Sequence, residues 1–496
     1  MQKDIPMNEI NPIRIHAAND KPVNQSGDYV IYWMTAFRRT KWNFGLQQAV
    51  KRALQLNKPL VILEPLRVNY QWASDRFHQF VIEGMKSNQE SLKDYTVTYI
   101  PYVEPRQNAS TGLLTSLATR ACCVITDDYP CFFLPTMIRY IRNKLPVLLE
   151  LVDSNCIMPL RLAERTFTVA HSYRRWMQKN ILEHLQQMPE QNPLDSVNLP
   201  RLDAKQLTKT LKRWPAADLE SLLDDGGLAP LPIDHSVRPV STALGGEAEA
   251  EKRLGLFLDQ QLLSYDVERN HPDYEATSRL SPYLHFGHLS AHQFVHDVLA
   301  HENWSFLQVG SPNGKNNGFW NVSPSAEGLL DQLVTWRELG FNFAFRHPRE
   351  IDRYESLPAW AIASLETHAS DPRPYVYTLA EFENSETHDH IWNAAQRELV
   401  TTGTLHNYMR MLWGKQILHW SKSPEDAIKI LIHLNNKYAL DGRDPNSYSG
   451  IFWVLGRYDR AWGPKRPVFG SVRYMTSESA MRKLKMKKYL EKHRPL

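Results

Sequence analysis

The sequence predicts a two-domain protein: an α/β domain built on a doubly wound parallel five-stranded sheet, followed by a large all-α domain. Between residues 28 and 160, short apolar runs alternate with amphipathic stretches, which is typical of strands joined by crossover helices. From residue 246 to the C-terminus, apolar residues recur every three to four positions, as they do on helices that bury one face. At 496 residues, the chain is long enough for both domains to have substantial cores.

Apolar runs give the predicted strands of the first domain in order, and stretches with helical periodicity separate them. The runs are YVIYWM, PLVILEPL, TVTYIPYV, CCVITDDY and LPVLLELVD. No GxGxxG sequence follows the first run, so a dinucleotide-binding fingerprint of that kind is absent. The all-α domain is predicted from segments such as HLSAHQFVHDVLA and LLDQLVTWRELGFNFAF.

Two further segments complete the predicted organisation. Residues 1–27 are polar and are expected to form a loosely ordered extension. Residues 161–245 contain turn formers, including DDGG and several prolines, and are expected to form an interdomain linker. The predicted domains are therefore 28–160, an α/β domain, and 246–496, a helical domain.

The composition is ordinary for a soluble globular enzyme, with 42% hydrophobic and 23% charged residues. The formal net charge of +4 is too small to indicate a partner. Residues 463–496, however, hold ten Lys or Arg against two Glu, a net charge of +8. Such a segment suits a polyanion, although a solvated basic terminus is the commoner meaning of such runs.

The four cysteines form no CxxC pair and have no metal-binding spacing, so no metal site is expected. Free thiols fit a reducing compartment, and the N-terminus has no apolar run typical of a signal peptide. No stretch approaches 18 consecutive apolar residues, so no membrane span is expected. These features predict a cytoplasmic protein.

Residues 388–446 carry the most informative pattern. The stretch holds three tryptophans, an arginine inside an apolar helix, and a loop, ALDGRDPN, with two carboxylates. Taken singly, a tryptophan on an apolar face is usually core and DGRDPN is usually a turn. An unpaired guanidinium inside an apolar helix is costly, so Arg410 is expected to have a carboxylate partner.

In order and spacing, HDHIWNAAQRELV, GTLHNYMRMLWGKQILHW and LNNKYALDGRDPN resemble the flavin-binding domain of the photolyase/cryptochrome family, specifically its class II photolyases. YWM and ELVDSNCIMPLRL are similar to the start and end of the family's N-terminal domain. In many relatives that domain binds an antenna chromophore, 8-hydroxy-5-deazaflavin or folate. After YWM the family has an RDQR-type segment, whereas this chain has AFRRTKWN, so antenna binding is left open.

The resemblance implies FAD as cofactor. The implied contacts to FAD come from Tyr265, Ser278, Leu280, Ser281, Asn435, Asp441 and Asp444. Asp441 would pair with Arg410 beside the isoalloxazine, and Asn435 would face flavin N5. The first four of these residues would touch the pyrophosphate, although TSRLSPYLHFGHLS in isolation indicates only a capped helix start. Asn436 replaces an aspartate of the family.

The resemblance also implies an electron relay and a lesion pocket. Trp392, Trp413 and Trp420 match the class II triad that photoreduces FAD. Trp336 and Trp453 match the aromatic walls for a flipped-out pyrimidine dimer, and bases taken out of a duplex do need stacking surfaces. The remaining residues matched to lesion or DNA contacts are Arg269, Gln332, Met411, Lys465, Arg466 and Arg473.

Two of the pocket positions depart from the family. Gln332 stands where photolyases that act on cyclobutane dimers have Glu, and Gln cannot supply a proton or a negative charge. Gln is usual in (6-4) photolyases, but these have two histidines where this chain has Asn407 and Met411. Class II members have Gly at position 407.

Three functions follow as hypotheses. The favoured one is a light-driven DNA repair flavoenzyme, a carbon–carbon lyase, that acts as a monomer on UV-damaged DNA and splits cyclobutane pyrimidine dimers by electron transfer from photoexcited reduced FAD. The second is a cryptochrome-like photoreceptor that keeps FAD and the tryptophans but has lost repair. The third is a flavin- and nucleic-acid-binding protein without photochemistry.

Overall fold

The computed structural model describes residues 8–195 and 197–495. The chain forms two compact units that are discontinuous in sequence. We call the first the α/β unit (Met1–Glu164, Asn180–Leu254 and Pro282–Asp297) and the second the helical unit (Arg165–Lys179, Gly255–Ser281 and Val298–Leu496). The predicted fold class, an α/β domain with a large helical one, is confirmed. Within the described residues, no helix has the length and apolar character needed to cross a bilayer.

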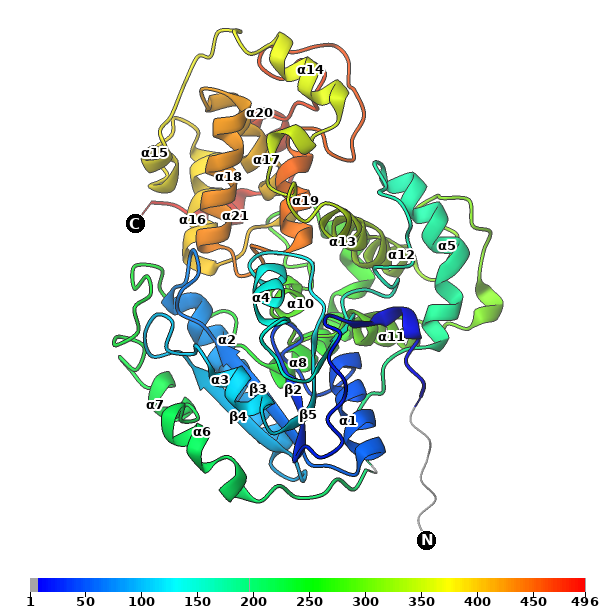
Figure 1. Cartoon of the computed structure of the whole chain (residues 1–496). Helices are drawn as coiled ribbons and strands as arrows, with labels where there is room; N and C mark the ends of the chain where they lie inside the picture. Colours follow the sequence, from blue (N-terminus) through cyan, green and yellow to red (C-terminus); the bar gives the residue numbers. More distant parts are fainter. Residues whose placement is uncertain (1–7, 196, 496) are drawn as a thin grey trace. The chain divides into compact units, whose positions relative to one another are not determined.

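The sheet of the α/β unit has six strands in the order β1-β6-β5-β2-β3-β4 (Figure 1). The strands are β1 (Ile15–Ala17), β2 (Tyr29–Trp33), β3 (Leu60–Leu66), β4 (Thr98–Val103), β5 (Ala121–Asp127) and β6 (Leu148–Val152). The five predicted strands are β2 to β6, and they pair in parallel throughout. The strand order reverses beside β2, as in doubly wound folds.

The sixth strand corrects the prediction of five. β1 forms the edge of the sheet, pairs antiparallel with β6 and lies in the segment expected to be a loose extension. Its three residues, IHA, contain no apolar run that would have revealed it. Beside it, the buried Arg14 guanidinium donates to the carbonyls of Cys156 at 3.1 Å and Ile157 at 2.6 Å. Backbone pairing and this arginine, rather than side-chain burial, hold β1.

Helices cover both faces of the sheet, so every residue of β2 is buried. Tyr29, Ile31 and Trp33 pack in one core cluster, while Val30 and Tyr32 pack in another, as the alternation along a strand requires. The helices of this unit include α1 (Phe44–Leu56), α2 (Asp75–Leu92), α3 (Leu113–Ala118), α4 (Leu134–Ile141), α6 (Thr208–Arg213) and α7 (Leu219–Leu223). Residues 161–245, expected as a linker, contain α6, α7 and α5 (Ala170–Gln186).

The carboxyl ends of β2 and β5, where doubly wound sheets commonly bind ligands, are filled by the chain itself. The Asp127 carboxylate accepts hydrogen bonds from the backbone N–H groups of Thr35, Ala36 and Phe37 at 2.7–3.0 Å. Arg39, 1% exposed, donates to the carbonyl of Gly287 at 3.0 Å. Gly287 has φ 77°, and a Cβ there would lie 2.0 Å from the Ala36 oxygen, so only glycine fits.

The helical unit contains most of the remaining helices, although residues 247–254 and 282–297 belong to the α/β unit. Those from residue 247 onward are α8 (Glu247–Gln260), α9 (Tyr265–Glu268), α10 (Ser281–Phe286), α11 (Ala291–His301), α12 (Pro324–Leu330), α13 (Arg337–Arg346), α14 (Ala359–Thr367), α15 (Leu379–Glu383), α16 (His390–Thr402), α17 (Asn407–Trp420), α18 (Pro424–Tyr438), α19 (Pro445–Trp453), α20 (Ser477–Lys483) and α21 (Lys487–Lys492). A π-helical turn, η5 (Asp331–Trp336), precedes α13 directly.

Short polar residues set where the central helices begin and end. Asp389 accepts from two backbone N–H groups at the start of α16, and Ser423 and Asp444 each accept from one at the starts of α18 and α19. Gly403, with φ 66°, ends α16 in the left-handed conformation. These local signals set the bounds of α16, α18 and α19.

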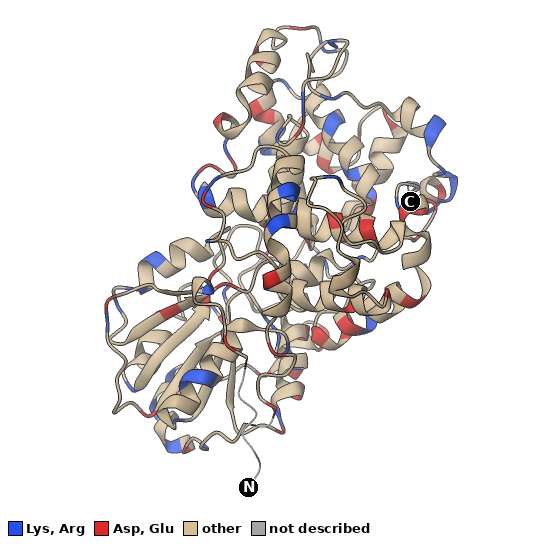
Figure 2. Cartoon of the chain, turned by 90° about the vertical axis from the view of Figure 1, so that its right-hand side faces the viewer, with Lys and Arg blue, Asp and Glu red and all other residues tan. Residues whose placement is uncertain are grey.

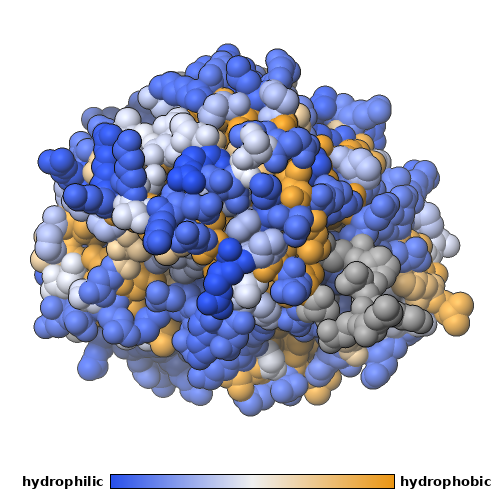
Figure 3. All heavy atoms as spheres, turned by 60° about the horizontal axis from the view of Figure 1, so that its bottom comes forward, coloured by the Kyte–Doolittle hydropathy of each residue, from blue (hydrophilic) through white to orange (hydrophobic). Residues whose placement is uncertain are grey.

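The surface shows no single dominant chemical character. Lys and Arg alternate with Asp and Glu along the ribbon (Figure 2). On the face drawn in Figure 3, hydrophilic residues predominate and hydrophobic residues are exposed in separate small areas.

Replacing Asp127 tests how the loop after β2 is held. We expect Asp127→Ala to lower the free energy of unfolding by about 3 kcal/mol, because three buried N–H groups lose a charged acceptor. Asp127→Asn keeps one acceptor oxygen, so its free energy of unfolding should fall by less than that of Asp127→Ala. Urea denaturation followed by circular dichroism measures both values, and an Ala variant as stable as the wild type would contradict this account.

Candidate functional site

A polar cluster in the helical unit joins α17, α18 and the loop that follows α18. The Arg410 guanidinium donates to both oxygens of Asp441, at 2.9 and 3.0 Å, and to Oδ1 of Asn435 at 3.0 Å. The side chains of Arg410 and Asp441 are only 24% and 15% exposed. We call these three residues the arginine cluster. The Arg410 guanidinium is therefore partly buried, and its two partners hold it in one orientation.

The loop after α18 owes its shape to close backbone approach. A Cβ at Gly442 would lie 2.9 Å from the Asn435 carbonyl oxygen, so a larger residue would displace the loop. Arg443 has φ 68°, which is unfavourable for a side-chain-bearing residue, and its N–H donates to Oδ1 of Asn436 at 2.9 Å. The Asn436 Nδ2 donates to Tyr448 Oη at 3.2 Å. The Asn436 side chain therefore both accepts and donates a hydrogen bond, whereas an ionised aspartate at this position could only accept.

Asp444 is the second carboxylate of the loop. It accepts from Ser447 N at 2.6 Å at the start of α19, and it is 6% exposed. Burial raises the pKa of Asp444 to about 7, against the opposing effects of the Ser447 hydrogen bond and of Arg337 and Arg410. This carboxyl group therefore lies within electrostatic reach of the arginine cluster and of α13.

Glu398 links the segment around Ser281 to the same region. Burial raises the pKa of this carboxyl group, and the guanidinium groups of Arg279 and Arg410 oppose the rise. Arg279 lies within the segment that holds Ser278, Leu280 and Ser281. Arg279 and Arg410 therefore both lie within electrostatic reach of the Glu398 carboxyl group, in the helical unit.

The upstream residues Tyr265 and Arg269 form a pair on and after α9. The Arg269 guanidinium lies over the Tyr265 ring at 5.2 Å, and its Nη1 is 3.4 Å from the Tyr265 hydroxyl. Nε of Arg269 and Oγ1 of Thr335 are buried and have no hydrogen-bond partner within the described chain. Unused buried donors of this kind fit a ligand with anionic or carbonyl oxygens, such as a flavin dinucleotide.

Three buried indoles form a continuous chain. Trp392 lies in the middle: its ring centroid is 6.4 Å from that of Trp413, nearly parallel, and 6.2 Å from that of Trp420, nearly perpendicular. Each is at most 2% exposed. The Trp392 indole N–H donates to the Trp413 carbonyl at 3.0 Å, and the Trp413 indole N–H donates to Gln396 Oε1 at 2.9 Å. Gln396 is a contributor that sequence reasoning missed.

Aromatic contacts continue from Trp420 towards the surface. Its ring lies 5.9 Å from that of Tyr377 and 4.9 Å from that of His388. His388 stacks on Tyr375 at 3.7 Å, and Tyr375 is 45% exposed. At the other end, Trp413 follows Arg410 by three positions on α17 and so shares a helix face with it. The aromatic contacts thus lead from Trp413, on the same helix as Arg410, to the exposed Tyr375.

The residues matched to a lesion pocket are half-buried, unlike the core around them. They are Gln332, Trp336, Met411 and Trp453. The first two lie on η5, a π-helical turn, and such turns are frequent at functional sites. Asp331 anchors η5 through a buried ion pair with Arg174, at 2.6 Å.

The predicted basic contacts lie in the loop after α19. Lys465, Arg466 and Arg473 are all exposed. Arg466 and Gly470 exchange two backbone hydrogen bonds, at 3.0 and 2.7 Å, which makes the segment a tight turn. Arg473 stacks on Trp462, with its Cζ 4.7 Å from the ring centroid.

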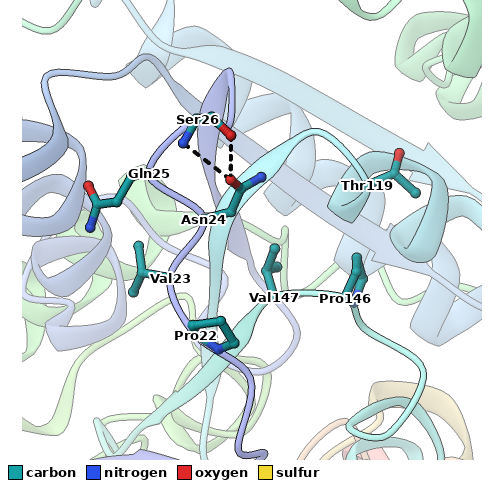
Figure 4. A pocket seen from close by; sticks show the side chains of 8 residues that line it. All are labelled: Pro22, Val23, Asn24, Gln25, Ser26, Thr119, Pro146 and Val147. Carbon is teal, nitrogen blue, oxygen red and sulfur yellow. Dashed lines mark hydrogen bonds between the residues drawn. The ribbon is translucent and has the colours of Figure 1, made fainter.

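One pocket of the α/β unit is lined by none of these residues. It is lined by Pro22, Val23, Asn24, Gln25, Ser26, Thr119, Pro146 and Val147 (Figure 4). No charged side chain lines it, and Thr119 and Val147 place it at the amino ends of β5 and β6. Doubly wound sheets bind ligands at the opposite ends of their strands. Among the described residues, no group of three His, Cys, Asp or Glu could hold a metal ion.

The sheet order, the helical unit, the arginine cluster and the indole chain together define a protein of the photolyase/cryptochrome type. No family model matches the chain. It is 32% identical to a deoxyribodipyrimidine photo-lyase from Methanothermobacter thermautotrophicus, over 98% of this chain and 99% of the relative. It is 30% identical to one from Arabidopsis thaliana, over 95% of this chain and 90% of the relative.

The chain belongs to the deoxyribodipyrimidine photo-lyase family, and the enzyme class expected from the sequence is confirmed. The fold agrees with a crystal structure of a bacterial class III photolyase from Agrobacterium tumefaciens. That structure matches 94% of this chain with a TM-score of 0.63 and 15% sequence identity, and this chain covers 86% of it.

The arginine cluster can be tested without any ligand. We expect Arg410→Met to lower the free energy of unfolding of the FAD-free protein by about 2 kcal/mol, because the Asp441 carboxylate loses its partner while partly buried. A double-mutant cycle with Asp441→Ala isolates the pairwise energy in urea denaturation. A coupling energy of zero would show that the pair contributes nothing to the fold.

Proposed function

We propose that this protein is a light-driven DNA repair enzyme of the class II type, which splits cyclobutane pyrimidine dimers with an electron from reduced FAD. The observations that carry this proposal are the arginine cluster and a buried chain of three indoles, of which Trp413 lies three positions after Arg410 on α17. A site that needs both an anion-stabilising pocket and a path for electrons is typical of photochemistry on a flavin. A flavin- and nucleic-acid-binding protein without photochemistry has no use for such a chain.

The arginine cluster and the segment before α10 would hold FAD. Asn435 would face the reactive edge of the isoalloxazine, and its amide is oriented by Arg410 and by Ser447, whose Oγ accepts from Nδ2 at 2.7 Å. The Arg410 guanidinium would stabilise negative charge on the ring system. When bound and reduced, FAD supplies the electron on absorption of light. The pyrophosphate would lie along Tyr265, Ser278, Leu280 and Ser281, and Asp441 and Asp444 would contact the rest of the dinucleotide.

The indoles would keep the cofactor reduced. Trp413 would be the first donor, because it shares a helix face with Arg410, and Trp392 would pass an electron between Trp420 and Trp413. Ring separations of 6.2 and 6.4 Å support this order. The three rings are buried, and the aromatic contacts beyond Trp420 offer a path to solvent through His388 and Tyr375.

The substrate would be UV-damaged DNA, bound by a monomer. Trp336 and Trp453 would stack on the flipped-out dimer, with Met411 beneath it. Gln332 would hydrogen-bond a base edge without supplying a proton. Arg269, Lys465, Arg466 and Arg473 would make salt-sensitive contacts to DNA. An antenna chromophore is not part of the proposal.

A second candidate is a cryptochrome-like photoreceptor that has lost repair. Gln332 and Asn407 favour it, because both alter the lesion pocket while the arginine cluster and the indoles are complete. An assay of repair on dimer-containing DNA separates the two functions.

The repair assay uses the purified protein with bound FAD and a duplex that contains one thymine dimer. We expect blue light to restore the two thymines, measured by chromatography of the digested DNA, with no restoration in the dark. Absence of repair by a protein whose FAD is bound and photoreducible would reject the repair function and favour the photoreceptor.

The electron path is tested by Trp392→Phe. We expect this variant to bind FAD normally but to lose its photoreduction, because the central ring of the chain is no longer oxidisable. Absorption spectra recorded during illumination measure the change. Trp304→Phe is the matched control, since Trp304 packs against Trp320 outside the chain. Undiminished photoreduction in the Trp392 variant would rule out this path.

A further inference from the structure

A buried lysine lies behind one wall of the proposed lesion pocket. Lys415 is on α17, five positions after Arg410, and is 0% exposed. Its Nζ donates to the carbonyl of Val454, the residue directly after α19, at 2.6 Å. Among the described residues, no carboxylate lies within 4.0 Å of this Nζ. A buried ammonium without a paired carboxylate costs stability, so packing alone does not account for it.

The ammonium contacts the indole that precedes its acceptor. Nζ of Lys415 is 4.8 Å from the ring centroid of Trp453. The Arg473 guanidinium also lies near that ring, at 5.8 Å. Trp453 itself is half-buried, so part of its ring remains available to a ligand. Indole binds cations more strongly than the other aromatic side chains, and desolvation strengthens the interaction.

We propose that Lys415 is a positioning residue for lesion recognition: its ammonium, anchored on the Val454 carbonyl, fixes the Trp453 indole in the orientation that stacks on the dimer. This role rests on the proposed function, since it is that function which makes Trp453 a wall of the pocket. Lys415 does not touch the DNA. It acts on the ring from behind, and through the ring it sets the preference for damaged over undamaged DNA.

The charge of Lys415 changes near neutral pH. Burial lowers the pKa of Lys415 to about 7, Asp459 opposes this, and Arg473 adds to it. These two are the charged groups that act on Nζ. Asp459 is held in place by the Trp462 indole N–H, at 3.0 Å. The ammonium, and with it the cation–π contact, is therefore present below about pH 7 and is lost as the pH rises above it.

The test compares Lys415→Met, which has no charge, with Lys415→Arg, which keeps it at every pH used. Lys429→Met is the matched control, because the Lys429 side chain is 76% exposed on α18. Fluorescence anisotropy measures the affinity of each FAD-bound protein for a duplex with one thymine dimer and for the undamaged duplex, at about pH 6 and about pH 8. FAD content and photoreduction are measured on the same samples.

We expect the wild type to prefer the damaged duplex by roughly five- to tenfold more at the lower pH than at the higher one. At both pH values, Lys415→Met should prefer the damaged duplex only as weakly as the wild type does at the higher pH. Lys415→Arg should prefer it at both pH values as strongly as the wild type does at the lower pH. FAD content and photoreduction should be unchanged in all variants. If Lys415→Met fails to fold, the role of Lys415 is still tested by comparing how the preference for the damaged duplex changes with pH in the wild type and in Lys415→Arg.

A lesion-selective wild type whose preference does not change with pH, or an unchanged Lys415→Met variant, would overturn the role of Lys415 alone. If the wild type with photoreducible FAD does not distinguish the two duplexes, the proposed repair function fails, and the role of Lys415 fails with it.

Discussion

The ion pair between Arg410 and Asp441 is the interaction on which the rest of the helical unit depends. It ties α17 to the loop after α18, and through Asn435 it also fixes the end of α18. A guanidinium with two fixed partners cannot turn away from its site, so the charge that it offers to a ligand is pre-organised. The close approach of Gly442 to the Asn435 backbone adds a steric limit to the same geometry.

A single helix carries every part of the proposed chemistry. Along α17, Arg410 belongs to the arginine cluster, Met411 to the lesion pocket, Trp413 to the indole chain and Lys415 to the support of Trp453. Successive residues of a helix point in directions about 100° apart. Arg410 and Trp413 therefore share one face of the helix, Met411 and Lys415 share another, and a shift of α17 would disturb the proposed flavin site, the relay and the pocket together.

Features that follow from the local residue pattern could be predicted from the sequence. Features that follow from contacts between segments distant in the sequence could not. Strands β2 to β6 followed from apolar runs because both faces of each are covered. β1 was missed, because an antiparallel edge strand held by backbone bonds leaves no apolar pattern. The partner of Arg410 was expected from the energetic cost of a buried guanidinium. The central place of Trp392, the support of Trp413 by Gln396 and the π-helical form of η5 required the tertiary structure, since ring separations and backbone register are not local properties.

The most direct measurement is a crystal structure of the protein purified with its cofactor. The account predicts FAD in the helical unit, with its isoalloxazine within hydrogen-bond distance of Asn435 and Arg410 and with Trp413 as the nearest indole. A protein that takes up no flavin, or a flavin bound away from these residues, would contradict it.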